Sequence, residues 1–390
     1  MIIFAVIFSA RLYPQSWAEV VNFPGSARDD AASFSIGDFG YVLTGMQQDF
    51  SSTNNGYKYH AYTYIWYPID SLPAAPRQYS CAFAINNKGY LIGGINGSTY
   101  LNDCWEYDPV LDNWTAKDSL PSFGRSACTC FSMNGKGYIG TGATNGNTLT
   151  DEWWEFEPLT NTWTQKADFS GGPRKVAAGF AVNGKGYIIA GIDSNLVMHN
   201  DVWEYDPVLN IWTQKNDFPG TPRFYAKGIS MNNTGYITTG WDTTQHYLND
   251  LWQYNAALDN WIVLDTIPSF RRKGVSVFTV NDVLFLTTGI DHDGQRLTEA
   301  WAYGSTIGIE EENAQKKIAV FPNPSKGNFN LYIPPELYPA TISIINILGE
   351  KVYGSVATSS PIQLQVDQRG TYIINVQAGN KTYSTTCIVE

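Results

Sequence analysis

The sequence predicts an all-β fold, in which a six-bladed β-propeller precedes a small C-terminal antiparallel β-sandwich. Three observations support this prediction. The 390 residues include 35 Gly, 13 Trp and 24 Tyr but only 16% charged residues, which favours short strands and tight turns over amphipathic helices. Tryptophan and arginine recur every 48 or 49 residues over most of the chain. Each period contains four apolar runs separated by turn residues, as a four-stranded unit requires.

The first 16 residues form a separate segment. They begin with the apolar run MIIFAVIFSA, which is too short to span a bilayer and resembles the hydrophobic part of a signal peptide. Because the usual basic start is missing, a buried first strand is the alternative interpretation. We expect signal cleavage between Ala10 and Trp17, and no other stretch approaches transmembrane length.

Residues 17–304 contain the repeat. A first tryptophan series has steps of 49, 48, 49, 49 and 49 residues, and a second has steps of 49. An arginine stands eleven residues after each member of the first series, and one glycine recurs in each period. Six such registers predict six blades, because about 50 residues is the size of a four-stranded blade. The repeated residues are Trp17, Trp66, Trp114, Trp163, Trp212 and Trp261; Trp105, Trp154, Trp203, Trp252 and Trp301; and Gly45, Gly94, Gly142, Gly191, Gly240 and Gly289.

The repeat resembles a known family. The double glycine Gly93-Gly94, the Trp-Glu-Tyr-Asp-Pro runs at 105–109 and 203–207 and the later tryptophan of each period are similar to kelch repeats. The resemblance covers roughly residues 17–303 and implies a kelch-type propeller. It departs from the family where Thr-Gly or Ala-Gly replaces Gly-Gly. A Thr or Ala side chain there needs only slightly more space than glycine.

The last period lacks an outer strand, since it stops after Trp301-Ala-Tyr303. The N-terminal residues 17–25 (WAEVVNFPG) align with residues 212–220 (WTQKNDFPG) of an earlier period. We therefore expect the first strand after the signal to pair with the last blade and close the ring. Closure of this kind removes a sheet edge that would otherwise invite aggregation.

The C-terminal part begins with a polar linker at 305–317 and continues as a sandwich at 318–390, with strands expected at 318–321, 329–333, 341–347, 351–353, 362–366, 371–376 and 382–389. The runs VFPNPSKGNF (320–329), INILGEKV (345–352) and GTYIINV (370–376) resemble the type IX secretion (Por) sorting domain. This resemblance implies that residues 318–390 engage the type IX secretion machinery. The protein would then be secreted or reach the outer cell surface of a Gram-negative bacterium; an ordinary adhesive sandwich is the alternative.

Composition argues against several other partners. A net charge of -11 and a pI near 4.9 oppose binding to nucleic acid, which needs a basic surface. The five cysteines lack metal-ligand spacing and are interpreted as small core residues; Cys128 and Cys130, on one strand, are poorly placed for a mutual disulfide. His199, His246 and His292 follow their blade glycines by 8, 6 and 3 residues, so they do not converge by symmetry. We expect no metal and no cofactor.

The candidate ligand-binding residues lie in two kinds of loop. The arginine loop precedes the first strand of each blade, the variable loop joins the second and third strands, and both should open on the same face. The repeated arginines would ring the channel mouth there, and in kelch propellers that resemble this one the equivalent arginines can line the ligand pocket. Alternatively, each arginine braces a neighbouring blade. The six are Arg28, Arg77, Arg125, Arg174, Arg223 and Arg272.

The variable loops differ between blades, as a specific site requires. Asp193, Asp242 and Asp291 each stand two residues after the blade glycine, and Trp241 belongs to neither tryptophan series. A tryptophan with carboxylates and guanidinium groups around a funnel suits stacking on a sugar ring with polar contacts at its edge. In the alternative interpretation, Trp241 simply packs against the next blade.

The sequence assigns no catalytic residue, since it shows no Gly-rich phosphate loop, Ser-His-Asp order or acid pair at a suitable spacing. The predicted function is an exported, noncatalytic protein that binds a glycan or another protein through the arginine-lined face. The alternative is a sugar mutarotase or epimerase on the kelch scaffold, with arginine and carboxylate as acid and base.

Overall fold

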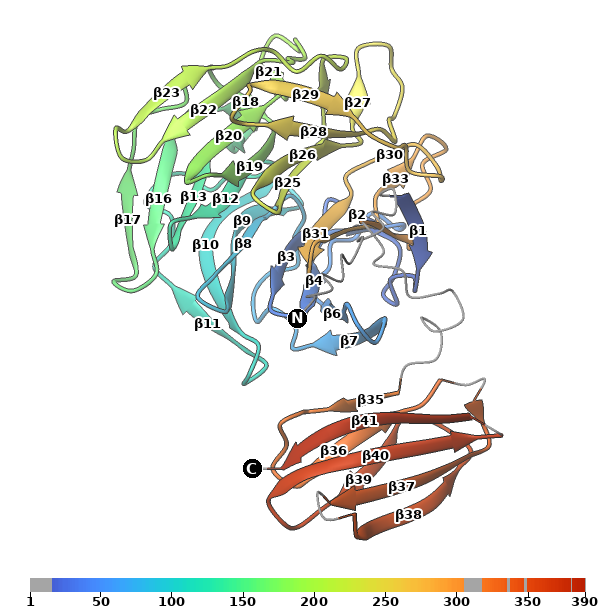
Figure 1. Cartoon of the computed structure of the whole chain (residues 1–390). Coiled ribbons are helices and arrows are strands. Elements are labelled where there is room, and N and C mark those ends of the chain that lie inside the picture. The colour runs from blue at the N-terminus through green and yellow to red at the C-terminus, as the bar shows by residue number, and fades with distance from the viewer. Residues whose placement is uncertain (1–15, 305–317, 335–336, 347–348, 380, 390) are drawn as a thin grey trace, which may run out of the picture. The chain divides into compact units, whose positions relative to one another are not determined.

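The computed structural model describes residues 16–304, 318–334, 337–346, 349–379 and 381–389. The chain divides into two compact units, one of residues 14–305 and one that includes residues 306–390 (Figure 1). The regular structure in the described ranges is β, apart from 3-10 turns such as Asn145–Asn147, and no helix there is long and apolar enough to cross a membrane. The expected signal segment, up to residue 15, and the expected linker lie outside the described residues.

The N-terminal unit contains six four-stranded antiparallel sheets, which are the blades. In each sheet, the strand named first is the innermost and the strand named last is the outermost. The first three are β3 (Ala32–Ile36), β4 (Phe39–Leu43), β6 (Gly56–His60) and β7 (Ile65–Ile69); β8 (Cys81–Ile85), β9 (Lys88–Asn96), β10 (Thr99–Asp108) and β11 (Asn113–Lys117); and β12 (Thr129–Met133), β13 (Lys136–Gly140), β16 (Trp153–Glu157) and β17 (Thr162–Gln165). The next two are β19 (Ala178–Val182), β20 (Lys185–Ile189), β22 (Val202–Asp206) and β23 (Ile211–Gln214); and β25 (Lys227–Met231), β26 (Thr234–Thr238), β28 (Leu251–Asn255) and β29 (Asn260–Val263). The sixth is β31 (Ser276–Val280), β32 (Val283–Thr287), β34 (Ala300–Gly304) and β1 (Ser16–Val20).

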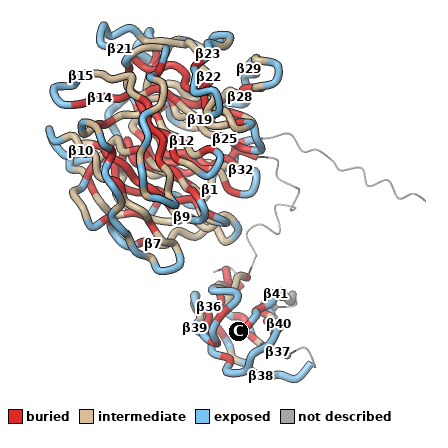
Figure 2. The backbone as a smooth tube through the Cα atoms, turned by 90° about the vertical axis from the view of Figure 1, so that its left-hand side faces the viewer, coloured by how far each residue is buried: buried red, intermediate tan, exposed pale blue. Residues whose placement is uncertain are grey.

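The innermost strands form a ring. Each of β3, β8, β12, β19, β25 and β31 contacts the innermost strands on both sides, and β31 contacts β3. Buried residues occupy the interior of this unit, while exposed residues concentrate at the loops (Figure 2). The glycine of each Gly-Tyr pair belongs to this packing: a Cβ on Gly89 would lie 2.3 Å from the Phe34 ring of the preceding blade. Glycine therefore recurs there because it admits an aromatic ring between blades.

The N-terminal strand completes the sixth sheet, as its alignment with the other blades predicts. β1 pairs with β34 in antiparallel register from Ser16↔Gly304 to Val20↔Ala300. The Trp17 indole donates a hydrogen bond to the carbonyl of Asp265 in the fifth blade, with 3.2 Å between nitrogen and oxygen. The two ends of the repeat region are thus joined within one sheet.

A second set of hydrogen bonds joins each blade to the next. The N–H of each blade glycine donates to the carbonyl of the next blade's repeated arginine, and Gly289 closes the set on Arg28 at 2.9 Å. These glycines have φ between +91° and +112°, a conformation in which a side chain is strained. The glycine recurs because this inter-blade contact requires that backbone.

The C-terminal unit is a sandwich of two antiparallel sheets, and its seven strands match those expected from the sequence to within a few residues. One sheet contains β35 (Ala319–Phe321), β36 (Asn328–Tyr332) and β39 (Ile362–Gln365); the other contains β38 (Lys351–Ala357), β37 (Ala340–Asn346), β40 (Gly370–Ala378) and β41 (Lys381–Val389). Phe329, Leu331, Ile342, Ile344 and Ile374 are among its buried core residues. This unit has its own hydrophobic core.

Candidate ligand-binding face

The arginine loops and variable loops lie together at one end of the propeller, as predicted. Short two-stranded sheets join them, with Arg28 opposite Gln47, Arg174 opposite Asp193, Arg223 opposite Asp242 and Arg272 opposite Asp291. We call this end the loop face.

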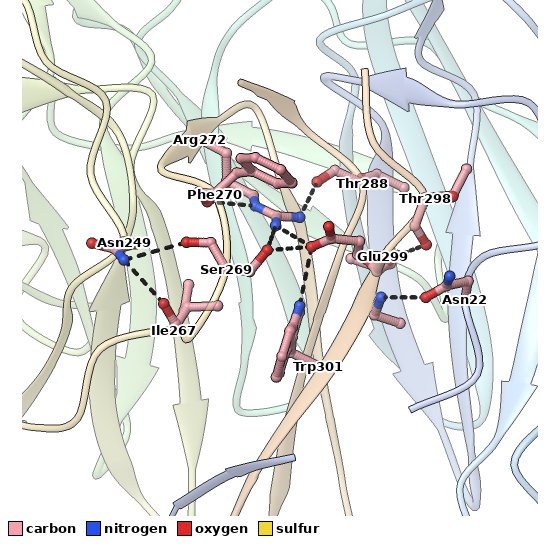
Figure 3. Close-up of polar contacts among 12 residues, drawn as sticks. Asn22, Asn249, Ile267, Ser269, Phe270, Arg272, Thr288, Thr298, Glu299 and Trp301 are labelled. Carbon is pink, nitrogen blue, oxygen red and sulfur yellow. Dashed lines mark hydrogen bonds and ion pairs between the residues drawn. The ribbon is translucent and has the colours of Figure 1, made fainter. Parts of the chain in front are cut away.

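The six arginines are buried rather than displayed on the loop face: none is more than 1% exposed. Arg272 shows why (Figure 3). Its guanidinium donates to the Glu299 carboxylate and the Ser269 hydroxyl, both at 2.6 Å, and to the carbonyls of Phe270 and Thr288. Thr288 directly precedes the blade glycine, so the side chain supports the backbone that contacts the next blade.

A carboxylate completes this brace in five blades. It stands two residues before each second-series tryptophan, whose indole N–H also donates to it, as Trp301 does to Glu299 at 3.3 Å. The five carboxylates are Asp103, Glu152, Asp201, Asp250 and Glu299. Sequence analysis missed this repeated acid, although its fixed spacing from tryptophan was visible.

The first blade lacks the carboxylate. Asn55 occupies the equivalent position, and Arg28 instead donates to the carbonyls of Ser26 and Thr44, each at 3.0 Å. Burial lowers the pKa of Arg28 to about 10. The buried Asn55 side-chain oxygen has no hydrogen-bond partner. Arg28 is therefore a buried cation held by neutral acceptors alone.

These contacts change the interpretation of the arginines. A guanidinium that is fully buried and bonded within its own blade offers no surface to a ligand. We therefore assign Arg28, Arg77, Arg125, Arg174, Arg223 and Arg272 to the bracing role that was the alternative in the sequence analysis.

The three candidate aspartates shape the variable loops. Asp193 accepts hydrogen bonds from the N–H groups of Asn195 and Val197. Asp242 and Asp291 likewise accept from the backbone N–H groups two and four residues after them. Partial burial favours the neutral form, but these hydrogen bonds outweigh it and lower the pKa of Asp193 and of Asp242. The three aspartates thus hold the conformation of their loops through hydrogen bonds to backbone N–H groups.

Trp241 belongs to a cluster on the loop face that is not repeated. Lys273 Nζ lies 4.3 Å from the Tyr225 ring centroid, 4.7 Å from Trp241 and 5.4 Å from Tyr247. All four side chains are half-buried, and Phe224 stacks on Trp241 at 5.2 Å. We call Tyr225, Trp241, Tyr247 and Lys273 the aromatic–lysine cluster. It presents aromatic rings around a cation, an arrangement stabilised by cation–π attraction.

Two residues beyond each repeated arginine, six backbones form an inner ring at this end of the channel. Five of the six residues donate their N–H to the carbonyl of the member in the preceding blade, at 2.8 to 3.1 Å; Tyr79, for example, donates to Asp30, and Asp30 donates to Gly274. All six residues have φ between +48° and +65°. The members are Asp30, Tyr79, Ala127, Val176, Tyr225 and Gly274.

Three polar side chains of the inner ring interact. The Tyr79 hydroxyl hydrogen-bonds to Asp30 and lies 3.1 Å from the Tyr225 hydroxyl. Burial, with a smaller contribution from the negative charge of Asp29, raises the pKa of Asp30 to about 8, although Tyr79, Lys227 and Lys273 oppose the shift. A carboxyl that stays protonated near neutral pH can donate a hydrogen bond.

The inner ring borders a cavity of about 300 Å³ that follows the central channel between the innermost strands. Asp30, Tyr79, Tyr225 and Lys227 line it, together with Ser80. None of these residues was a sequence-based candidate. Comparing the six periods two residues after the arginine would have revealed Asp30, Tyr79 and Tyr225, because Asp, Tyr, Ala, Val, Tyr and Gly share that position.

The histidines do not converge. His199 pairs with Asp193 at 3.3 Å, His246 lies 2.8 Å from the Thr244 hydroxyl and His292 packs on Tyr247. Among the residues that the structure describes, no group of three or more His, Cys, Asp or Glu side chains is arranged to hold a metal ion.

Comparisons with known proteins agree with this architecture. A family model described as the KLHDC2/KLHL20/DRC7 Kelch-repeats domain matches residues 14–178, and one described as the secretion system C-terminal sorting domain matches residues 319–390. A solved structure titled "Structure of YjhT" is similar with a TM-score of 0.63 and 16% identity, over 72% of this chain and 95% of that one. At that identity the likeness shows the fold alone. No curated protein matches the sequence.

The fold and these matches define a kelch-type β-propeller protein that is exported. The chain carries kelch repeats in its N-terminal unit and ends in a type IX secretion sorting domain. That domain directs the protein to the outer cell surface or the extracellular space.

Proposed function

We propose that this exported protein is a noncatalytic binding protein that recognises a glycan through the loop face. The observation that carries the proposal is the aromatic–lysine cluster, a half-buried group of side chains on the loop face that is not repeated in the other blades. Aromatic rings such as Trp241 provide flat apolar surfaces for sugar rings, and the half-buried Lys273 supplies a polar group nearby.

The position of the cluster supports this proposal. Trp241 lies opposite Phe224 in the sheet that joins the two loops of one blade, and Lys273 comes from the arginine loop of the next. The cluster therefore spans two blades and adjoins the inner ring through Tyr225. A sugar stacked at this position would reach both the face and the channel mouth.

A glycan array probed with the full chain tests the proposal. We expect Trp241→Ala to weaken binding of any captured glycan by roughly tenfold or more, the loss expected for an aromatic stacking contact. The matched control is Tyr62→Ala, since Tyr62 is 51% exposed in the turn between β6 and β7, away from the variable loops. Equal binding by both variants would contradict the proposal, and capture of a protein but no glycan would point to a protein ligand.

One observation favours the second candidate, a sugar mutarotase or epimerase. Asp30 has a raised pKa of about 8 beside the Tyr79 hydroxyl, which suits a general acid acting near neutral pH. Anomer exchange measured by NMR separates the candidates. Exchange that is lost in Asp30→Asn would favour the enzyme, whereas binding without exchange supports the noncatalytic protein.

A further inference from the structure

Three of the five cysteines meet between two neighbouring blades. Cys81 begins β8 of the second blade. Cys130 lies in β12 of the third blade, and Cys128 directly precedes the first residue of β12. These innermost strands lie side by side without sharing a sheet. The other two cysteines, Cys104 and Cys387, are buried elsewhere.

The Cys81 thiol lies near both of the other two cysteines. Cys81 Sγ points at the Cys128 carbonyl at 3.5 Å, and Cys130 Sγ points back at the Ala82 carbonyl at 3.6 Å. The Cys81 thiol also interacts with the sulfur atoms of both Cys128 and Cys130. All three residues line the central cavity, and Cys128 and Cys130 are half-buried rather than fully enclosed.

The surroundings of the three cysteines favour a disulfide between the two blades. The cluster does not form one of the arrangements that would hold a metal ion in the described part of the chain. Cys128 and Cys130 are separated by one residue of the same strand, a poor geometry for a disulfide with each other. Cys81 comes from the opposite blade and can approach either. An exported protein meets oxidising conditions, in which neighbouring thiols form disulfides.

We propose that Cys81 forms an inter-blade disulfide with Cys128 or Cys130, and that the remaining thiol exchanges with it. The oxidant is an external disulfide, either a small molecule or a thiol–disulfide oxidoreductase. A Cys128 or Cys130 thiolate attacks that disulfide, forms a mixed disulfide and releases one thiol. Cys81 then loses its proton and attacks the mixed disulfide, so that the protein disulfide forms and the second external thiol leaves. Two protein thiols are oxidised and one external disulfide is reduced.

The order of attack follows from burial. Burial raises the pKa of the Cys81 thiol well above its usual value, which disfavours Cys81 as the first nucleophile. The half-buried thiols at the cavity wall are the ones that an external disulfide can reach. Once Cys81 is joined to one of them, the other lies beside the bond and can displace its neighbour without net oxidation.

Tryptic mapping of the full chain tests the proposal with oxidised glutathione as the probe. Cleavage after Arg77, Lys88, Arg125 and Lys136 places Cys81 in peptide 78–88 and both partner cysteines in peptide 126–136. We expect oxidation to join these two peptides and to reduce the titratable thiols of the denatured protein from five to three. Five remaining thiols, or a link that involves Cys104 or Cys387, would overturn the proposal.

Variants separate the chemistry from folding. Cys128→Ser and Cys130→Ser should each retain the link, because the other cysteine replaces the missing one, while the double variant should lose it. Cys104→Ser, a change at a buried thiol outside the cluster, should retain it. Loss of the link in either single variant would refute exchange between the two partners. Cys81→Ser should also lose the link. If that variant fails to fold, the double variant alone decides the outcome, since both of its substitutions are at half-buried positions.

Discussion

At the scale of single residues, the repeat separates two kinds of side chain. Arginine, its carboxylate and the two tryptophans recur because each blade needs the same brace, and they are buried or bonded within the scaffold. Residues that break the repeat, such as Asp30 and Trp241, lie at the channel mouth and on the loop face. Periodicity therefore predicted the scaffold well, but it also made the repeated arginines look functional although they are buried. Trp241 was a candidate because it breaks the repeat, whereas Asp30 was missed.

The first blade, which lacks the carboxylate, provides a test of how much this carboxylate stabilises a blade. Asn55→Asp should raise the free energy of unfolding by about 1 to 2 kcal/mol, because it gives the buried Arg28 the charged partner that the other five arginines have. Urea denaturation at neutral pH measures the change. The reverse substitution in the fifth blade, Asp250→Asn, should destabilise by a similar amount; a neutral result in both would contradict the brace.

Asp30 predicts a pH dependence of stability. Its pKa is raised to about 8 in the folded chain by burial, whereas an unfolded aspartate titrates near 3.9. Between these values the folded state holds a proton that the unfolded state releases, so this contribution to stability falls as pH rises and is constant above the folded pKa. Asp30→Asn should remove that fall.

Denaturation of wild type and Asp30→Asn at about pH 5 and about pH 8 checks the sign. The stability of the variant relative to wild type should increase with pH, by at most about 1.4 kcal/mol per pH unit. Substitution of the exposed Asp293 by asparagine serves as the control, with little change expected between the two pH values. A relative stability that is constant or decreases with pH would show that Asp30 is ionised throughout.

At the scale of elements, the turn and strand pattern gave the four strands of each blade and the seven strands of the C-terminal unit. Alternating buried positions, as in β3, follow directly from the apolar–polar alternation of the sequence. The inner ring could not be predicted in this way, because four of its six positive φ values occur at Tyr, Ala and Val, which rarely adopt them. Hydrogen bonds between blades hold these residues in that conformation.

The closing strand β1 is the element whose removal is most informative. Deleting residues 17–24 removes the buried Trp17 and Phe23, each worth about 3 to 5 kcal/mol by comparison with Trp or Phe truncations in cores. We expect the unfolding temperature of the propeller to fall by roughly 10 °C or more. Glu19→Ala, at an exposed position of β1, should leave the melt nearly unchanged. A deletion variant that melts like wild type would contradict a stabilising role for β1.

At the scale of the whole molecule, the propeller is a closed ring of similar sheets joined by three sets of contacts. Strand β1 completes the last sheet, the blade glycines bond to the next blade's arginine, and the inner ring links the arginine loops. Sequence comparison of the periods predicted closure by the N-terminal strand. It could not predict the cavity or the thiol cluster, because both arise where residues of different blades meet.

Hydrogen–deuterium exchange of the full chain in increasing urea tests ring closure most directly. If β1 is an integral part of the last sheet, amides of Trp17 to Val20 that pair with β34 should be protected and should open together with those of β32 and β34 in one cooperative event. Amides of β1 that exchange like an unstructured peptide, while β32 and β34 remain protected, would contradict the closed ring.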